Sequence, residues 1–374
     1  MLMSDGSAVF ESATSLVHER RAGDAVNSTP RIIGQLFSDE AIALLFRPFE
    51  HARGILLAVS GGPDSVALML IAAQWAKRLA APPQICVATV DHGLRENAAR
   101  EAEIIARWAS KLSLPHAILV WEGVKPKSRV QELAREARYE LLFQHAARIG
   151  ADCVMTAHHA DDQAETILFR LLRGSGISGL AGMQSVSERS GLILARPLLG
   201  YAKADLIAFC EAEAHPFIED PSNDDPRFAR TRLRRLSGLL AREGLNRAAL
   251  LKLGKRAAQA EAALANRART VGDRLPARRE PGAFEGDVSA LANEPDEVVL
   301  RILATELKLI GSGKALRLER LEVLTGRLAQ ALRAGIDYRA TLGGTTLRLK
   351  SNHTLVIVKE PARRRDQKNP PRPS

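Results

Sequence analysis

Cysteine is scarce in this 374-residue chain, which contains three. Cys86, Cys153 and Cys210 lie far apart and form no CxxC pair. The sequence therefore predicts neither a disulfide framework nor a zinc or iron–sulfur site built on cysteine. We expect these residues to be small members of the core.

Long apolar runs are missing as well. No segment approaches the roughly 20 uninterrupted apolar residues of a membrane span, and the first thirty residues lack the apolar stretch of a secretory signal. The content of 46% hydrophobic and 26% charged residues is that of a folded soluble protein. We expect a cytoplasmic protein of two domains without a membrane partner. The sequence predicts no oligomeric state.

Acidic residues are few in one part of the chain. Between Arg227 and Glu280, fifteen Lys or Arg stand against four Asp or Glu, whereas the whole chain has 53 against 43. Such a segment suits a polyanion, because each neutralised phosphate releases counterions. A solvated helix face is the alternative.

The pattern from Gly54 to Glu213 predicts an α/β fold. Short apolar runs alternate with segments of 3.6-residue apolar spacing, which is typical of a Rossmann-like doubly wound parallel sheet. The expected strands are Ile55–Val59, Ile85–Val90, Ala117–Val120, Asp152–Thr156 and Leu192–Ala195. The expected helices are Asp64–Leu79, Ala98–Leu112, Val130–Ile149, Asp162–Leu172 and Lys203–Ala212.

A change of composition follows at Glu219–Phe228, a stretch rich in Pro, Asp and Asn. Beyond it, helical spacing at about Thr231–Arg274 and Pro295–Ala334 predicts a smaller, mainly helical basic domain, interrupted by the turn-rich RLPARREPGAFEGD. A hairpin is expected around Ser351, Asn352 and His353. Residues 361–374 are expected to form a disordered basic tail.

A glycine pair joins the first expected strand to a helix, in the sequence Ser60-Gly61-Gly62-Pro63-Asp64-Ser65. The carboxyl end of a parallel strand is where such folds bind ligands. Glycines let backbone N–H groups approach a phosphate, and the N-terminus of a helix favours an anion. The GxxxxGK[ST] pattern of a Walker loop is absent from this turn. A tight turn capped by Ser60 or Asp64 is the alternative.

The SGGxDS sequence resembles the signature of the PP-loop ATP pyrophosphatases. The resemblance implies that residues 60–65 bind ATP, which is cleaved between its α- and β-phosphates to adenylate a substrate. Further blocks are similar to the tRNA(Ile)-lysidine synthetase family. They are VDHGLR from Val90, AREARY from Ala134, AHHADDQAET from Ala157, and RGSG with GLAGM between Arg173 and Met183.

This resemblance implies a reaction and its participants. Lysine would be ligated to carbon 2 of the wobble cytidine in the CAU anticodon of isoleucine tRNA, through an adenylated cytidine. The products would be lysidine, AMP and pyrophosphate, and the participants ATP, Mg²⁺, the tRNA and free L-lysine. The expected parts are an N-terminal extension (1–50), a PP-loop catalytic domain (51–225), a basic helical tRNA-binding domain (226–335), and the hairpin with its tail (336–374).

Carboxylates near the third block suit a metal ion. On a helix, His158 and Asp162 are four apart, and Asp162 and Glu165 are three apart, so they would share one face. Beside a triphosphate, paired carboxylates typically hold Mg²⁺. We expect Asp64, Asp162 and Glu165 to be catalytic, with Asp64 and Asp162 as metal ligands. Helix capping by Asp161 or Asp162 beside a structural histidine is the alternative.

Four arginines are expected to contact the substrate or tRNA. Arg135 and Arg138 are three apart on a helix and suit a phosphate clamp, although surface pairing with neighbouring glutamates is an alternative. Arg230 and Arg234 follow from the family resemblance. There the chain departs from the family's Arg-Asn-x-hydrophobic-Arg pattern, because Thr231 replaces the Asn.

Two other functions are alternatives to this prediction. A PP-loop tRNA thiolase also adenylates a base, but sulfur delivery usually involves paired cysteines or a cluster, which the three separate cysteines do not offer. A non-catalytic RNA-binding protein with a vestigial nucleotide fold would have no use for Asp64, Asp162 and Glu165.

Overall fold

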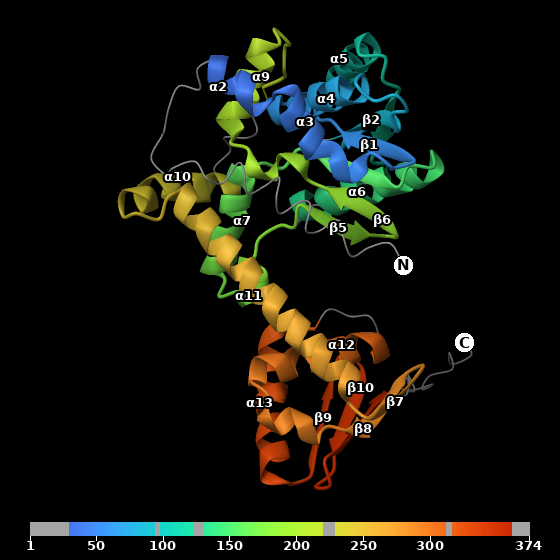
Figure 1. The fold of residues 1–374 in the computed structure, drawn as a ribbon, viewed down its shortest axis with the longest axis vertical. Coiled ribbons are helices and arrows are strands. Elements are labelled where there is room, and N and C mark those ends of the chain that lie inside the picture. The colour runs from blue at the N-terminus through green and yellow to red at the C-terminus, as the bar shows by residue number, and fades with distance from the viewer. Residues whose placement is uncertain (1–29, 94–97, 123–129, 220–228, 312–315, 361–374) are drawn as a thin grey trace, which may run out of the picture. The chain divides into compact units, whose positions relative to one another are not determined.

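The computed structural model describes residues 30–93, 98–122, 130–219, 229–311 and 316–360. The side chains at 30–32, 130–131, 229–232, 234–235 and 237 lie outside this description. Most of the expected N-terminal extension and the expected basic tail also lie outside it. The chain divides into two compact units, Met1–Ala257 and Ala258–Ser374, which are described separately (Figure 1).

Unit 1 is built on a six-stranded sheet. Its strands are β1 (Gly54–Ala58), β2 (Gln84–Asp91), β3 (His116–Val120), β4 (Cys153–Thr156), β5 (Val186–Arg189) and β6 (Leu192–Ala195). They lie in the order β3-β2-β1-β4-β6-β5, and only β5 is antiparallel to its neighbour. The carboxyl ends of the five parallel strands therefore meet at one edge, where ligands bind in folds of this kind.

Helices cover both faces of this sheet (Figure 1). They are α2 (Pro30–Leu36), α3 (Asp39–Phe46), the short η1 (Arg47–Phe49), α4 (Pro63–Ala76), α5 (Ala98–Lys111), α6 (Val130–Arg148), α7 (Ala160–Leu172), α8 (Ile177–Leu180), η2 (Pro197–Gly200) and α9 (Lys203–Ala212). Ile55 and Leu57 of β1 pack in a core with α4, α5 and α9, whereas Leu56 packs in a core with α6. Successive strand residues point to opposite faces, so a strand buried on both sides is a continuous apolar run.

The five predicted strands and five predicted helices of this sheet are all present, with ends within three residues of those expected. This confirms the doubly wound α/β fold. The structure adds elements that were not predicted, among them α2, α3 and the antiparallel edge strand β5.

A third group of helices follows in sequence, α10 (Ala229–Arg242) and α11 (Arg247–Arg274). The sequence predicts one helical segment here, and the break between α10 and α11 falls at Gly244, whose φ of +91° suits a glycine that ends a helix. Leu233 and Leu250 pack against Ile167 of α7 in a small core. The beginning of α11 therefore belongs to unit 1.

Unit 2 contains a five-stranded antiparallel sheet in the order β7-β8-β11-β10-β9. Its elements are β7 (Ala277–Glu280), β8 (Ala283–Asp287), η4 (Ser289–Asn293), α12 (Asp296–Ile310), α13 (Leu318–Ala334), β9 (Tyr338–Leu342), β10 (Thr345–Leu349) and β11 (Thr354–Lys359). Phe284, Leu347 and Ile357 of the sheet share one core with Val299 and Leu328 of the helices.

The predicted hairpin around Ser351 is confirmed, since it joins the paired strands β10 and β11. The segment expected to be turn-rich instead forms β7 and β8, so this part of the chain combines the predicted helices with a sheet.

The compact units and the expected domains have different boundaries. The compact units divide at Ala257, inside α11, whereas the sequence places its boundary near 225. Among the described residues, no helix is long and apolar enough to cross a membrane.

Candidate active site

The loop between β1 and α4 is closed by its own serines. The Oγ of Ser65 accepts the Ser60 N–H at 3.1 Å and donates to the Gly62 carbonyl at 2.9 Å. Ser65 is buried, and Ser60 Oγ lies 3.4 Å from its Oγ. These contacts fix the loop's shape before any ligand binds.

Glycine is required at the centre of this loop. Gly61 has a φ of +89°, and a Cβ added there would lie 2.7 Å from Cδ1 of Ile218, whose N–H donates to the Gly61 carbonyl. Gly62 is the N-cap residue of α4 and has no side chain to bond the first amides of the helix. Those amides and the helix dipole therefore suit an anion such as phosphate.

His159 is the N-cap residue of α7 and lies between carboxylates. Its Nδ1 accepts the Asp162 N–H at 3.3 Å, while Asp162 Oδ2 accepts the His159 N–H at 3.2 Å. This reciprocal capping assigns the ring proton to Nε2. Nε2 lies 3.5 Å from Asp64 Oδ2 and 3.4 Å from Asp162 Oδ2. The structure thus brings the predicted Asp64 and Asp162 to one buried atom.

The charges around His159 alter its protonation. Burial by itself lowers the pKa of His159, but the hydrogen bond to Asp64 and the charges of Asp162, Asp64 and Asp161 outweigh burial and raise the pKa above its ordinary value. Three carboxylates around one ring make this end of α7 an acidic site that favours a cation.

Asp64 and Asp162 suit a metal ion that also binds phosphate. Asp64 Oδ1 is buried and has no hydrogen-bond partner among the described residues, so it has a free acceptor position. No group of three or more His, Cys, Asp or Glu in the described part of the chain is arranged to hold a metal. A pair of carboxylates completed by phosphate oxygens is the usual arrangement for Mg²⁺. Glu165, the third predicted catalytic residue, lies one turn further along α7 and is partly buried.

One detail of the prediction is wrong. Because α7 begins at Ala160, His158 precedes the helix and does not share a helical face with Asp162. Its Nδ1 lies 2.8 Å from Oγ1 of Thr156 instead. The residue that the sequence analysis missed is His159, and the signal for it was an N-cap position three residues before Asp162.

Asp161 has a structural role beside this site. It accepts the Lys203 N–H at 2.9 Å and pairs with Arg247 of α11 at 2.9 Å. Burial raises the pKa of Asp161, but the bonds from Lys203 and Arg247 more than offset this and leave the pKa below its ordinary value. Asp161 is therefore ionised and ties α7 to its neighbours.

The glycine-rich segment after α7 is held by two further residues that sequence reasoning did not single out. Gln163 accepts the Met183 N–H at 2.7 Å and donates to the Met183 carbonyl at 2.9 Å. Arg170 donates to the carbonyls of Gly179 and Gly182, both at 2.8 Å. This part of the family-like sequence is thus fixed on the helix that carries Asp162.

The VDHGLR block lies at the same sheet edge. Asp91 ends β2, its Oδ1 accepts the Gly93 N–H at 2.8 Å, and its carbonyl accepts the Trp121 N–H at 2.8 Å. The rings of His92 and Trp121 meet edge to face with centroids 6.1 Å apart. Residues 94–97, with the rest of the block, lie outside the described residues.

The predicted arginines fall into two groups. Arg135 and Arg138 of α6 both lie over the ring of Tyr139, with guanidinium carbons 5.3 and 5.5 Å from its centroid. Arg230 and Arg234 are on α10, but their side chains lie outside the description. Contact of these four with tRNA stays a prediction.

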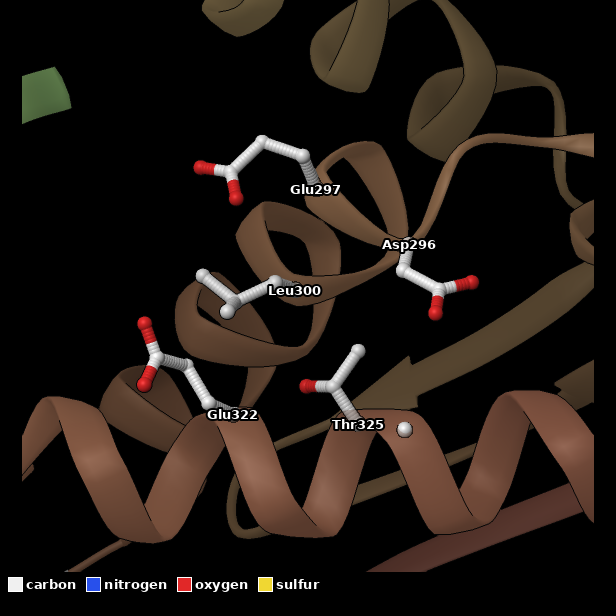
Figure 2. A pocket seen from close by; sticks show the side chains of 6 residues that line it. Asp296, Glu297, Leu300, Glu322 and Thr325 are labelled. Carbon is white, nitrogen blue, oxygen red and sulfur yellow. The ribbon is translucent and has the colours of Figure 1, made fainter. Parts of the chain in front are cut away.

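A pocket of about 140 Å³ lies in unit 2 between α12 and α13. Figure 2 shows Asp296 and Glu297 on α12 and Glu322 and Thr325 on α13 around it. None of the predicted site residues is among the described residues that line this pocket, so it is separate from the site at His159.

Comparison with known proteins gives consistent results. Residues 34–238 match the model of a family described as a PP-loop domain. A tRNA(Ile)-lysidine synthase from Methylobacterium nodulans is 51% identical over 318 residues, which are 84% of this chain and 92% of the relative. A tRNA(Ile)-lysidine synthase from Bradyrhizobium diazoefficiens is 43% identical over 339 residues, covering 86% of this chain and 94% of the relative.

A solved structure shares the fold. The U34-tRNA thiolase NcsA from Methanococcus maripaludis with its 4Fe-4S cluster is similar with a TM-score of 0.52 and 13% identity. The match covers 62% of this chain and 81% of that one. At this identity the likeness is one of fold alone.

Proposed function

The chain belongs to the tRNA(Ile)-lysidine synthase family, and from this membership we propose that it ligates lysine to carbon 2 of a wobble cytidine. The cytidine is that of the CAU anticodon of isoleucine tRNA. Its carbonyl oxygen attacks the α-phosphate of ATP and expels pyrophosphate. The ε-amine of free lysine then attacks the activated carbon, AMP leaves, and lysidine remains.

The observation that carries this proposal is the convergence of Asp64 and Asp162 on His159 Nε2, at the end of the loop whose amides suit phosphate. The amides of Gly62 and the first turn of α4 bind phosphate oxygens. Asp64 and Asp162 would hold Mg²⁺, which supplies positive charge against the phosphates when bound. His159 orients the two carboxylates, and Glu165 supports them.

The remaining predicted parts complete the proposal. Residues 51–225 form the catalytic domain, and the basic stretch from Arg227 to Glu280 binds tRNA backbone within the expected domain 226–335. Arg135, Arg138, Arg230 and Arg234 contact the substrate. A base that reacts at its Watson–Crick edge has to be splayed from the anticodon loop, so the arginines hold the loop while the base turns inward. A cytoplasmic location is part of the same proposal.

The test is whether the reaction requires each of the proposed substrates. AMP formation from ATP is measured with purified protein in the presence of lysine, of a CAU-anticodon tRNA transcript with unmodified cytidine, of both and of neither. We expect AMP in quantity only with both, and a modified nucleoside heavier by lysine less water. AMP formation that depends on tRNA but not on lysine would overturn the proposed nucleophile, and a nucleoside that gains sulfur would indicate a thiolase.

A further inference from the structure

Four arginines gather around one tyrosine in unit 1. The guanidinium carbons of Arg135, Arg138 and Arg189 lie 5.3, 5.5 and 4.6 Å from the centroid of the Tyr139 ring. Arg196 is the fourth member, because its Nη1 lies 3.4 Å from Ser187 Oγ on β5, the strand that ends in Arg189, and its charge interacts with Tyr139, Arg135 and Arg189. The first two come from α6, the third ends β5, and the fourth follows β6. The fold, and not a local repeat, places these charges together.

Arg196 is held rigidly and retains an open donor. The residue is only 9% exposed. Its Nη1 donates to the Gln184 carbonyl at 2.7 Å and lies 3.4 Å from Ser187 Oγ. Its Nε is buried without a hydrogen-bond partner among the described residues. Burial lowers the pKa of Arg196, Tyr139 opposes this, and Arg135 and Arg189 lower it further.

Three of the four arginines have no countercharge in the described part of the chain. Arg135, Arg189 and Arg196 form no ion pair with a carboxylate of the described residues. Like charges this close repel one another, and a buried polar atom without a partner is unfavourable. A bound anion would relieve both.

Packing alone does not require so many charges. A guanidinium over an aromatic face stabilises the ring, and Arg189 also lies 5.7 Å from the centroid of Phe143. One arginine on each face would satisfy that role. Guanidinium groups stacked on a ring keep their N–H donors at the edges, in the fork that fits phosphate oxygens.

Three members of the cluster come from the catalytic edge of the sheet, whereas Arg189 pairs with Leu192 at the other end of β6 and its side chain reaches the Tyr139 ring from there. Ala195 of β6 pairs with Met155 of β4, so Arg196 comes next to Thr156, three residues before His159. The amino-terminal half of α6, with Arg135 and Arg138, follows β3 at the same edge.

We propose that Arg189 and Arg196 join Arg135 and Arg138 in one phosphate-binding site around Tyr139 that serves the reacting substrates. The inference rests on the proposed function and extends it to two arginines outside the family-like blocks. The phosphate belongs either to the tRNA backbone beside the reacting nucleotide or to ATP, and the two sources are distinguished by experiment.

The test uses Arg189, because it is exposed and its replacement disturbs the fold less than replacement of the buried Arg196. Arg189→Met keeps an apolar stem and removes the charge, and Arg189→Lys keeps the charge without the fork. Arg107→Met, an exposed arginine on α5, is the matched control for net charge. For each variant we measure the Kd for the tRNA transcript across a series of salt concentrations, the KM for ATP, and the Tm.

If the tRNA backbone supplies the phosphate, Arg189→Met weakens tRNA binding about tenfold and reduces the salt slope by about one, with the KM for ATP unchanged. If ATP supplies it, the KM for ATP rises about tenfold and the salt slope is unchanged. In either case Arg189→Lys is intermediate and the control matches the unaltered protein. The proposal is overturned if Arg189→Met and Arg107→Met agree in tRNA affinity, salt slope and KM.

The tRNA arm measures binding without turnover. If the lysine-dependent reaction is not observed, the tRNA affinities can therefore still be interpreted. If Arg189 does not contribute to binding, the result of the reaction test does not change.

Discussion

Two groups of arginines, one in each unit, differ in their partners. One group in unit 2 is paired with carboxylates: Arg267 with Glu294, Arg279 with Glu306, Arg301 with Glu261 and Glu297, and Arg333 with Asp296. In unit 1, Arg135, Arg189 and Arg196 gather around Tyr139 without a carboxylate partner among the described residues.

The carboxylates show the same contrast. Glu306 in unit 2 is almost fully buried and is matched by Arg279 at 2.9 Å. Asp64 and Asp162 in unit 1 share one histidine nitrogen, and Asp64 Oδ1 has no partner among the described residues. Matched charges hold a fold, whereas charges that the fold leaves unmatched are free to bind a ligand. The contrast predicts which substitutions remove activity and which remove stability.

The largest effect is expected at Asp162. Asp162→Asn keeps an oxygen for the His159 N–H but removes the negative charge that we assign to metal and phosphate binding. AMP formation in the presence of tRNA and lysine is expected to fall at least 100-fold, about 2.7 kcal/mol of transition-state stabilisation. The Tm and the Kd for tRNA should change little.

The matched control is the neighbouring carboxylate. Asp161→Asn weakens the contacts with Lys203 and Arg247, so the Tm should fall while most of the AMP formation remains. If Asp161→Asn lost as much activity as Asp162→Asn at an unchanged Tm, the division between catalytic and structural carboxylates would be wrong.

A smaller effect, on stability, is expected at Arg301 in unit 2. Its side chain is 11% exposed and lies between Glu261 and Glu297. Arg301→Met leaves both carboxylates without their cation. Breaking a buried pair costs about 3–5 kcal/mol, but both glutamates are partly solvated, so we expect a loss of about 2 kcal/mol in the free energy of unfolding.

Denaturant unfolding measures this loss. Arg278→Met is the control, because Arg278 and Glu280 pair in the open, at 81% and 51% side-chain exposure, and its midpoint should not move. Equal midpoints for Arg301→Met and Arg278→Met would mean that burial does not determine how much an ion pair of unit 2 contributes to stability.

Much of unit 1 was predictable from the sequence for a physical reason. Strands buried on both faces, such as Ile55–Val59, are apolar without interruption, and the amphipathic helices between them have a clear period. The Ser60–Ser65 loop was predictable because only glycine adopts the φ of Gly61 beside Ile218. The proximity of Asp64 and Asp162 followed from two strand ends at one edge.

Other features carried no such signal. β7 is an edge strand with three exposed residues, so the sequence of Ala277–Glu280 shows no apolar alternation and is typical of a turn. His159 was missed because a histidine N-cap is uncommon beside the Ser, Thr, Asp and Asn that usually cap helices. The arginines around Tyr139 come from three separate segments, and only the sheet order brings Arg189 and Arg196 to α6.

The smallest effect is expected at Thr325 in unit 2. Thr325 is 2% exposed, and its Oγ1 has no hydrogen-bond partner among the described residues. It lines the pocket between α12 and α13 (Figure 2). If unmatched polar atoms in this unit are costs to the fold, Thr325→Val should increase the free energy of unfolding by about 1 kcal/mol, because it removes a buried hydroxyl without a partner.

Thr345 supplies the matched control for this prediction. It is fully buried, but its Oγ1 donates to the Leu342 carbonyl at 2.6 Å, so Thr345→Val should decrease the free energy of unfolding by about 1 kcal/mol. Denaturant unfolding of both variants should therefore give shifts of opposite sign. A loss of stability in Thr325→Val equal to that in Thr345→Val would mean that the Thr325 hydroxyl does have a partner, such as a water molecule in the pocket. The Thr325 hydroxyl of unit 2 would then bind a partner from outside the chain, as we propose for the unpaired charges of unit 1.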